Sequence, residues 1–265
     1  MAIRKAGDRT GLRVKMCLYG RPDTGKTYAV TRLSNRFRTL ILDCEGGSMS
    51  APPEMPVGEF EDFEEINKIQ EDYPSAILRV TSTEQLTNIW RELRKGNGRW
   101  EVIVIDTITE AQRLLVESIK KHDSTVQRDL GILTLQGWNA LSEKFRSFAR
   151  AFRDLPYHVV FTAHERYVGD DSTGIQRWVP LFEGSKTAFE FVGLMDVVGH
   201  AIKHERQANG ELRTVREFRF VSTPTDEAKV RGGGLEVESA DLCLIFDKLL
   251  QQNTTKTEQV QKERE

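Results

Sequence analysis

The sequence has few cysteines, no long hydrophobic run and no excess of positive charge, and each absence excludes a class of protein. Its 265 residues include only three cysteines, an odd number that argues against a disulfide framework and favours buried thiols in a reducing compartment. No apolar stretch approaches the roughly 18 residues that a membrane-spanning helix needs. Residues 1–5 lack the apolar run of a secretory signal, so we expect a cytoplasmic protein without a membrane partner.

Metal clusters and a general affinity for nucleic acids are not indicated either. His200 and His204 are four residues apart, but they lie on a predicted strand, where the helical spacing rule for paired histidine ligands does not apply. The cysteines lie too far apart for a structural zinc site. The formal net charge is −2, whereas nucleic-acid-binding domains often carry a strong basic excess. Residues 1–38 are nevertheless strongly basic and residues 39–75 strongly acidic. This polarity is consistent with head-to-tail self-association, with an anionic ligand, or with a solvated surface.

What the sequence does contain is an alternation of apolar strands and amphipathic helices. Its length favours one decorated domain, placed at 1–250, and a disordered polar tail at 251–265. Continuous β-branched runs, such as the one over 101–106, are typical of parallel strands covered by helices on both faces. Apolar residues at helical spacing predict helices over 60–73 and 138–153. Hairpins are expected around residues 168–178 and 196–221, the second pairing 196–203 with 212–221. The pattern predicts an α/β fold with a mostly parallel central sheet flanked by helices and a C-terminal β-hairpin extension.

An eight-residue segment after the first strand predicts a phosphate-binding loop, or P-loop. It reads Gly-x-x-x-x-Gly-Lys-Thr, follows an apolar strand and opens a helix. In this pattern backbone N–H groups cradle phosphates, Lys26 reaches the terminal ones and Thr27 binds Mg²⁺. ATP and Mg²⁺ are therefore the expected cofactors; the alternative is a glycine-rich connecting loop with an exposed lysine. The predicted nucleotide-binding residues are Gly20, Arg21, Pro22, Asp23, Thr24, Gly25, Lys26, Thr27 and Tyr28.

Three further residues follow predicted strands and complete the predicted site. Asp106 ends a buried run and is the expected second Mg²⁺ ligand, with helix capping as the alternative role. Hydrolysis also requires a group that orients or deprotonates water beside the γ-phosphate. Glu45 and His164 both lie just after strands, where ligands of open parallel sheets gather. For both residues a purely structural role is the alternative.

The order of these motifs resembles that of the RecA-like ATPases. In that group the catalytic glutamate follows the strand after the P-loop helix, and Glu45 matches this position. AAA+ proteins and DExx-type helicases instead place a glutamate directly beside the aspartate that holds magnesium, where this chain has Thr107. Over residues 12–235 the chain also resembles the phage-encoded, single-domain RecA-like proteins that include the Sak-type single-strand annealing ATPases. The segments that carry this likeness are 136–138, 159–165, 184–186 and 191–199.

The resemblance implies ATP-dependent binding and annealing of single-stranded DNA in recombination or replication, in the cytoplasm of a bacterial host. A single-strand binding protein is a candidate partner. RecA-like proteins hold DNA in two loops, which correspond here to residues 121–137 and 165–186. The second loop combines cations for phosphates with aromatic rings for base stacking, although it also carries acidic residues. The DNA-binding candidates are Arg166, Tyr167, Arg177, Trp178 and Lys186.

The resemblance further implies a homo-oligomer, a filament or a ring, with the ATP site at a subunit interface. RecA-like ATPases complete this site with a pair of cations from the next subunit, and Lys229 and Arg231 match the spacing of that pair. A solvated loop is the alternative. Two other functions remain open. One is an ATP-dependent assembly switch or motor subunit that does not bind DNA; the other is a small-molecule kinase, for which no arginine-rich lid is present.

Overall fold

The computed structural model describes most of the chain. It covers residues 13–53, 55, 57–58, 75–96, 99–122, 132–169, 174, 176–184, 186–208 and 210–251. A helix predicted over 60–73, residues 123–131 of the first predicted DNA loop and residues 252–265 of the predicted tail lie outside these described residues.

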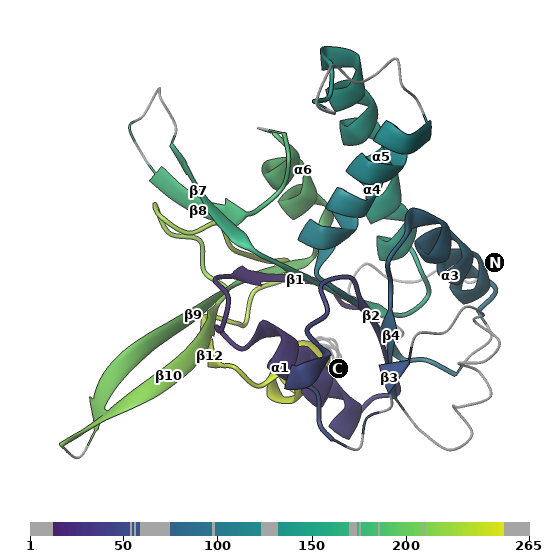
Figure 1. The fold of residues 1–265 in the computed structure, drawn as a ribbon. Helices are drawn as coiled ribbons and strands as arrows, with labels where there is room; N and C mark the ends of the chain where they lie inside the picture. Colours follow the sequence, from purple (N-terminus) through teal and green to yellow (C-terminus); the bar gives the residue numbers. More distant parts are fainter. Residues whose placement is uncertain are drawn as a thin grey trace, which may run out of the picture.

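One large sheet organises the molecule, and most of it is parallel. Within the described residues, ten strands form this sheet in the order β12-β10-β9-β1-β6-β5-β2-β4-β3, with β11 beside β9 (Figure 1). Neighbours from β9 to β3 run parallel, whereas β10, β11 and β12 pair antiparallel. The bounds are Lys15–Gly20 (β1), Thr39–Asp43 (β2), Val57–Gly58 (β3), Ala76–Arg79 (β4), Val102–Asp106 (β5), His158–Ala163 (β6), Val197–Ala208 (β9), Glu211–Arg219 (β10), Lys229–Val230 (β11) and Val237–Ser239 (β12). The predicted fold class is confirmed.

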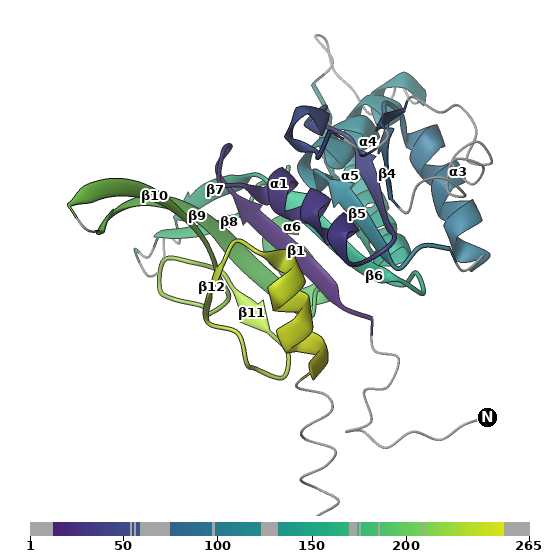
Figure 2. The same cartoon turned by 90° about the horizontal axis from the view of Figure 1, so that it is seen from below.

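Helices cover both faces of this sheet (Figure 2). On one face lie α3 (Thr83–Arg94), α4 (Ile108–His122), α5 (Leu135–Arg153) and α6 (Thr187–Leu194), whose apolar side chains share a core with Tyr19 and Leu42. On the other face, α1 (Lys26–Arg32) and a helix over 242–251 share a core with Leu18 and Ile41. Two apolar layers thus enclose the sheet, and its carboxyl edge stays open for ligands.

Strand β5 shows why its sequence is apolar throughout. All five of its residues are buried, and successive side chains point to opposite faces of the sheet. Ile103 and Ile105 therefore enter the core on the α4 side, while Val102 and Val104 enter the core on the α1 side. A strand covered on both faces needs an apolar residue at every position, so the unbroken run predicted this strand within one residue.

Two elements extend further than the sequence predicts. Helix α5 begins at Leu135 rather than residue 138, because the Thr134 hydroxyl accepts a hydrogen bond from the Gly137 N–H and caps the helix. Strands β9 and β10 form a hairpin that projects from the body (Figure 1). Their pairing continues to Ala208 and Glu211, beyond the predicted ends at 203 and 212.

Cysteines Cys17 and Cys44 are buried and Cys243 is half-buried, all three as free thiols. Burial raises the pKa of Cys17 and of Cys44, which keeps both thiols protonated and unreactive. Among the described helices, none has the length and apolar character needed to cross a membrane.

A buried histidine on β6 makes the stability of the fold sensitive to pH. His158 Nδ1 accepts a hydrogen bond from the Val14 N–H at 3.0 Å, and the ring packs near Phe37 and Phe246. Burial lowers the pKa of His158 from 6.5 to about 4. As the pH falls below 6.5, the unfolded chain gains a proton that the folded chain does not accept. The neutral, buried His158 therefore makes its full contribution to folding stability above pH 6.5, and this contribution is lost as the pH falls towards 4.

Replacing His158 with asparagine removes this titration and keeps an acceptor for the Val14 N–H. Between pH 7 and pH 5, urea unfolding of the wild-type chain should lose about 2 kcal/mol more stability than the variant does. Other groups also titrate, so the comparison is between the two slopes and not between absolute stabilities. Equal losses in both proteins would contradict the assignment of a neutral, buried His158.

Candidate active site

Candidate residues from four strands meet at one edge of the sheet. The P-loop follows β1, Glu45 lies two residues beyond β2, Asp106 ends β5 and His164 directly follows β6. Since these strands are parallel, their carboxyl ends lie on the same side, which is where open α/β sheets bind ligands. Strand β6 separates the P-loop strand from the aspartate strand. The expected edge placement of all these residues is therefore observed.

Two glycines account for the shape of the P-loop. A Cβ on Gly20 would collide with the carbonyl oxygen of Ala201, so only glycine allows β1 to end this close to β9. Gly25 has a φ of 89°, in the left-handed region, and immediately precedes α1. The backbone turns tightly there, as a loop that wraps around a phosphate requires.

The buried side chain of Lys26 points back into the P-loop. Its Nζ donates hydrogen bonds to the carbonyl oxygens of Gly20 and Arg21, both at 2.8 Å. Burial lowers the pKa of Lys26, while the nearby carboxylates of Asp106 and Glu45 oppose that shift. A partly desolvated ammonium interacts more strongly with an anion than one in bulk water does. Lys26 is thus prepared to bind a phosphate.

Thr27 and Asp106 form an oxygen pair that fits Mg²⁺. Asp106 is 1% exposed, and its carboxylate accepts hydrogen bonds from the hydroxyls of Thr27 and Thr162. Burial raises the pKa of Asp106, so a bound cation would favour its charged form. Gly47 leaves space beside the pair, since a Cβ there would lie 3.6 Å from Thr27 Oγ1 and 3.8 Å from Asp106 Oδ2. Hydroxyl and carboxylate oxygens are the ligands that Mg²⁺ prefers.

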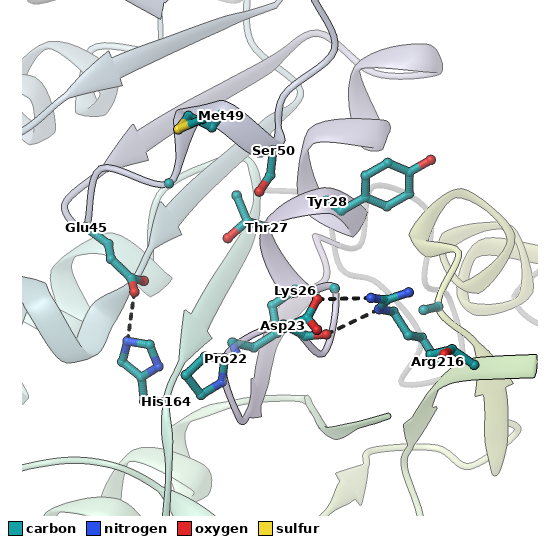
Figure 3. A pocket seen from close by; sticks show the side chains of 14 residues that line it. Pro22, Asp23, Lys26, Thr27, Tyr28, Glu45, Met49, Ser50, His164 and Arg216 are labelled. Atoms are coloured by element: carbon teal, nitrogen blue, oxygen red, sulfur yellow. Dashed lines mark hydrogen bonds and ion pairs between the residues drawn. The ribbon is translucent and has the colours of Figure 1, made fainter. Parts of the chain in front are cut away.

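Glu45 and His164, which follow β2 and β6, contact each other in the same site. The Nε2 of His164 lies 3.1 Å from Oε1 of Glu45 (Figure 3). This hydrogen bond lowers the pKa of Glu45 although partial burial opposes the shift. The backbone N–H of His164 in turn donates to Thr109 Oγ1 at 3.1 Å. The pair keeps an ionised carboxylate at a fixed position beside the P-loop.

Asp43 shapes the loop that carries Glu45, and sequence reasoning missed it. Its buried Oδ1 accepts hydrogen bonds from the backbone N–H groups of Glu45, Gly46 and Gly47, at 3.0, 2.6 and 3.2 Å. Arg79 lies 3.4 Å from the same oxygen. Aspartates often bond the backbone two residues further along, so the spacing of Asp43 and Glu45 was an available signal. Asp43 thereby positions Glu45 without facing the cavity.

A cavity of about 930 Å³ is lined by Lys26, Thr27, Glu45 and His164, among others. Figure 3 shows Glu45 and His164 at one end, Lys26 and Thr27 in the middle, and Asp23 with Arg216 at the other end. Tyr28, which is half exposed, also lines the cavity, as do Thr214 and Ala240. The cavity therefore runs from the predicted water-activating pair, past the P-loop, to the base of the β9–β10 hairpin.

Comparison with known families identifies the chain. Residues 12–231 match the family model described as an AAA domain. The chain belongs to this AAA domain family. Its P-loop, carboxyl-edge site and strand order are those of a P-loop ATPase with a RecA-like fold, a class that binds nucleotide and usually Mg²⁺. The predicted P-loop ATPase domain is confirmed, whereas the narrower likeness to the phage Sak-type annealing ATPases stays a prediction.

Two of the solved structures that are similar to this AAA domain share low sequence identity with it. A KaiC-like protein from the archaeon Pyrococcus horikoshii is 14% identical, with a TM-score of 0.38 and 78% of each chain covered. The flagellar accessory protein FlaH from Methanocaldococcus jannaschii is 12% identical, with a TM-score of 0.35, and the match covers 86% of this chain and 90% of FlaH. No curated protein sequence matches the chain.

A row of polar side chains, exposed at Arg21 and buried beyond it, ties the P-loop of the AAA domain to β7 (Glu165–Gly169) and β9. Arg21 Nε lies 3.2 Å from Glu165, whose other oxygen lies 2.8 Å from His200 Nε2. The opposite ring nitrogen of His200 lies 2.6 Å from Asp226, and the ring stacks on Tyr19. The three acidic and imidazole side chains are each less than a tenth exposed. Sequence reasoning missed this cluster, because only the tertiary fold brings its members together.

The five DNA-binding candidates of the AAA domain differ in their exposure to solvent and in the contacts that they make. Tyr167 and Lys186 are exposed. Arg166 donates to the carbonyl oxygen of Phe182, and Arg177 pairs with Glu227. Trp178, on β8 (Gln176–Pro180), packs between the ring of Tyr167 and the guanidinium of Arg21. The exposed candidates are thus Tyr167 on the β7–β8 hairpin and Lys186 at the start of α6, while Arg166, Arg177 and Trp178 are partly buried.

Lys229 and Arg231 lie towards the opposite edge of the AAA domain. Lys229 pairs with Val198 near the start of β9, and its Nζ donates to backbone carbonyls at the end of α6. Arg231 lies 2.9 Å from Asp196. Both cations contact groups at the amino ends of the strands rather than the P-loop of their own chain. Their predicted role in a neighbouring subunit stays a prediction.

Proposed function

We propose that this chain binds ATP with Mg²⁺, hydrolyses it and acts on single-stranded DNA, like the Sak-type annealing ATPases that its sequence resembles. Residues 1–250 would serve as one ATPase domain in the cytoplasm. The observation that carries the proposal is the cavity at the carboxyl edge of the sheet, where Lys26, Thr27 and Glu45 face one space. Phosphate, metal and water are thereby each given a suitable side chain.

Hydrolysis would depend on Glu45. Its lowered pKa keeps the carboxylate ionised at neutral pH, and His164 holds it in place. An ionised carboxylate orients a water molecule and accepts its proton as the water attacks the γ-phosphate. Lys26 offsets the charge that develops on the terminal phosphates. Mg²⁺, when bound by Thr27 and Asp106, supplies further neutralisation of phosphate charge.

Two features support DNA as the second ligand. The β7–β8 hairpin begins at Glu165, directly after His164, so a segment with exposed Tyr167 continues from the ATP site. A second cavity of about 590 Å³ reaches from Glu45 and His164 to Trp178 on this hairpin. Aromatic rings with neighbouring cations bind single strands by base stacking and phosphate contacts. DNA bound at the hairpin would then affect Glu45 and His164, the proposed water-activating pair.

The proposal includes a homo-oligomer in which Lys229 and Arg231 complete a neighbour's ATP site. These side chains point away from their own P-loop, and cations supplied across an interface accelerate phosphoryl transfer. A single-strand binding protein is a candidate further partner. Light scattering with ATP and single-stranded DNA tests assembly: particles larger than a monomer are expected, and a monomer under every condition would contradict this part.

The test of the DNA role is ATP turnover by the purified chain with and without a single-stranded oligonucleotide. We expect turnover to rise when DNA is added. A turnover rate unchanged by DNA, together with no retention of a labelled strand at low salt, would exclude DNA as the second ligand. ATP binding would then remain, as in an assembly switch.

Tyr167 allows a sharper test of the DNA contact. Tyr167→Ala is expected to weaken single-strand binding on the order of 10-fold, because stacking on one aromatic ring contributes about 1–3 kcal/mol per base. Tyr167→Phe is the matched control, since it keeps the ring and should bind nearly as the wild type does. Fluorescence anisotropy of a labelled oligonucleotide gives both affinities. Equal binding by the alanine variant would place the DNA contact elsewhere.

A further inference from the structure

Two cations from the β9–β10 hairpin hold an aspartate of the P-loop. Arg216 Nη2 lies 3.0 Å from Oδ1 of Asp23, and Arg216 Nε donates to the Asp23 carbonyl oxygen at 3.3 Å. Lys203 pairs with the other carboxylate oxygen, Oδ2. These hydrogen bonds lower the pKa of Asp23. The hairpin therefore grips the phosphate-binding loop through one acidic side chain.

The two cations are an unfavourable pair in themselves. Arg216 and Lys203 lie directly opposite each other on β10 and β9, so their side chains share one face of the hairpin. Like charges at directly opposite positions destabilise a strand pair. Asp23 offsets this repulsion, but it carries a single charge and is two-thirds exposed. Asp23 therefore neutralises only part of the positive charge of Arg216 and Lys203, and an anion with more negative charge would neutralise more of it.

Arg216 also borders the nucleotide cavity, whereas Lys203 does not. Arg216 lines the cavity together with Lys26, Thr27 and Tyr28. Its Cδ lies 3.0 Å from the point where a Cβ on Gly25 would be, so the side chain lies against the residue that opens α1. Arg216 therefore faces both Asp23 and the cavity, whereas Lys203 pairs with Asp23 outside the cavity lining.

We propose that Arg216 is a nucleotide ligand that leaves Asp23 to contact the phosphates of bound ATP. Asp23 acts as a stand-in anion that keeps Arg216 ordered while the site is empty. This inference rests on the proposed ATP binding and adds a residue to it. It also gives the projecting hairpin a direct contact with the nucleotide, because Arg216 belongs to β10.

If Arg216 leaves Asp23 for the nucleotide, removing Arg216 and removing the charge of Asp23 should have opposite effects on the affinity for ATP. Arg216→Ala should weaken ATP binding about 10-fold or more, since hydrogen bonds to charged groups are worth about 1.5–3 kcal/mol. Asp23→Asn should tighten ATP binding on the order of 5-fold, because it removes both the competitor for Arg216 and a negative charge near the phosphates. Asparagine tolerates the left-handed φ of 61° at this position, so the loop should keep its shape.

The measurement is the Kd of a fluorescent ATP analogue for the full chain, with competition by ATP. Arg213→Ala is the matched control, because Arg213 lies on the same strand, is exposed and pairs only with Glu211 among the contacts in the described residues. Its affinity should equal that of the wild type. Thermal midpoints without nucleotide check that every variant is folded.

A purely structural ion pair gives a different pattern. Arg216→Ala and Asp23→Asn would then weaken binding alike, and that result, or unchanged binding by Arg216→Ala, would overturn the inference while ATP binding itself stands. If the wild-type chain binds no ATP, both the proposed function and this inference fail. The two failures are therefore distinguishable.

Discussion

Lys26→Ala should bind ATP at least 100-fold more weakly than the wild-type chain. The Lys26 ammonium is buried within the P-loop and donates hydrogen bonds to the carbonyl oxygens of Gly20 and Arg21. Such a group gains about 1.5–3 kcal/mol from each charge-assisted hydrogen bond that it makes to a phosphate, and two such bonds account for this loss. Isothermal titration with ATP and Mg²⁺ measures the effect directly.

The fold should survive this substitution. Burial lowers the pKa of Lys26, which means that its charge is a cost in the absence of phosphate. Removing the charge relieves that cost while two carbonyls lose a donor, so we expect a thermal midpoint close to that of the wild type. Wild-type affinity for ATP in a folded Lys26→Ala protein would refute the phosphate-binding role of the loop.

Glu45→Gln is expected to keep ATP binding and to lose turnover by about 10²- to 10⁴-fold. Glutamine has the same shape and still accepts a hydrogen bond from His164, but it cannot take a proton from water. This change of one functional group should therefore lower the rate of ATP turnover without lowering the affinity for ATP. Turnover at the wild-type rate would show that another group activates the water.

His164 supplies the control for this interpretation. Its hydrogen bond lowers the pKa of Glu45 below the ordinary value of 4.5, so Glu45 stays ionised and active down to a lower pH. His164→Ala should raise the pKa of Glu45 and shift the acid limb of the rate profile to higher pH. An acid limb that does not move would separate His164 from the ionisation of Glu45.

Much of the site could be predicted because its signals are local. The P-loop is a contiguous segment, and Glu45 and Asp106 each follow an apolar run whose strand identity is readable from the β-branched residues. The parallel fold then dictates that strand ends meet at one edge. Local pattern and general topology were sufficient for these residues.

The remaining contacts depend on pairings that span the chain. Arg216 reaches Asp23 across 193 positions, and it does so only because the register of β9 and β10 places it opposite Lys203. His200 is read from the sequence as one residue of a strand, yet the fold places it between Glu165 and Asp226. A change of register by one residue would turn each side chain to the other face. Such contacts cannot be read from spacing.

Release of inorganic phosphate from ATP by the purified chain tests the central claim most directly. With Mg²⁺ present we predict continuous release that stops when the metal is chelated and is absent from the Lys26→Ala and Glu45→Gln proteins. No release above that of these two variants, either with or without single-stranded DNA, would contradict the account of this chain as an ATPase.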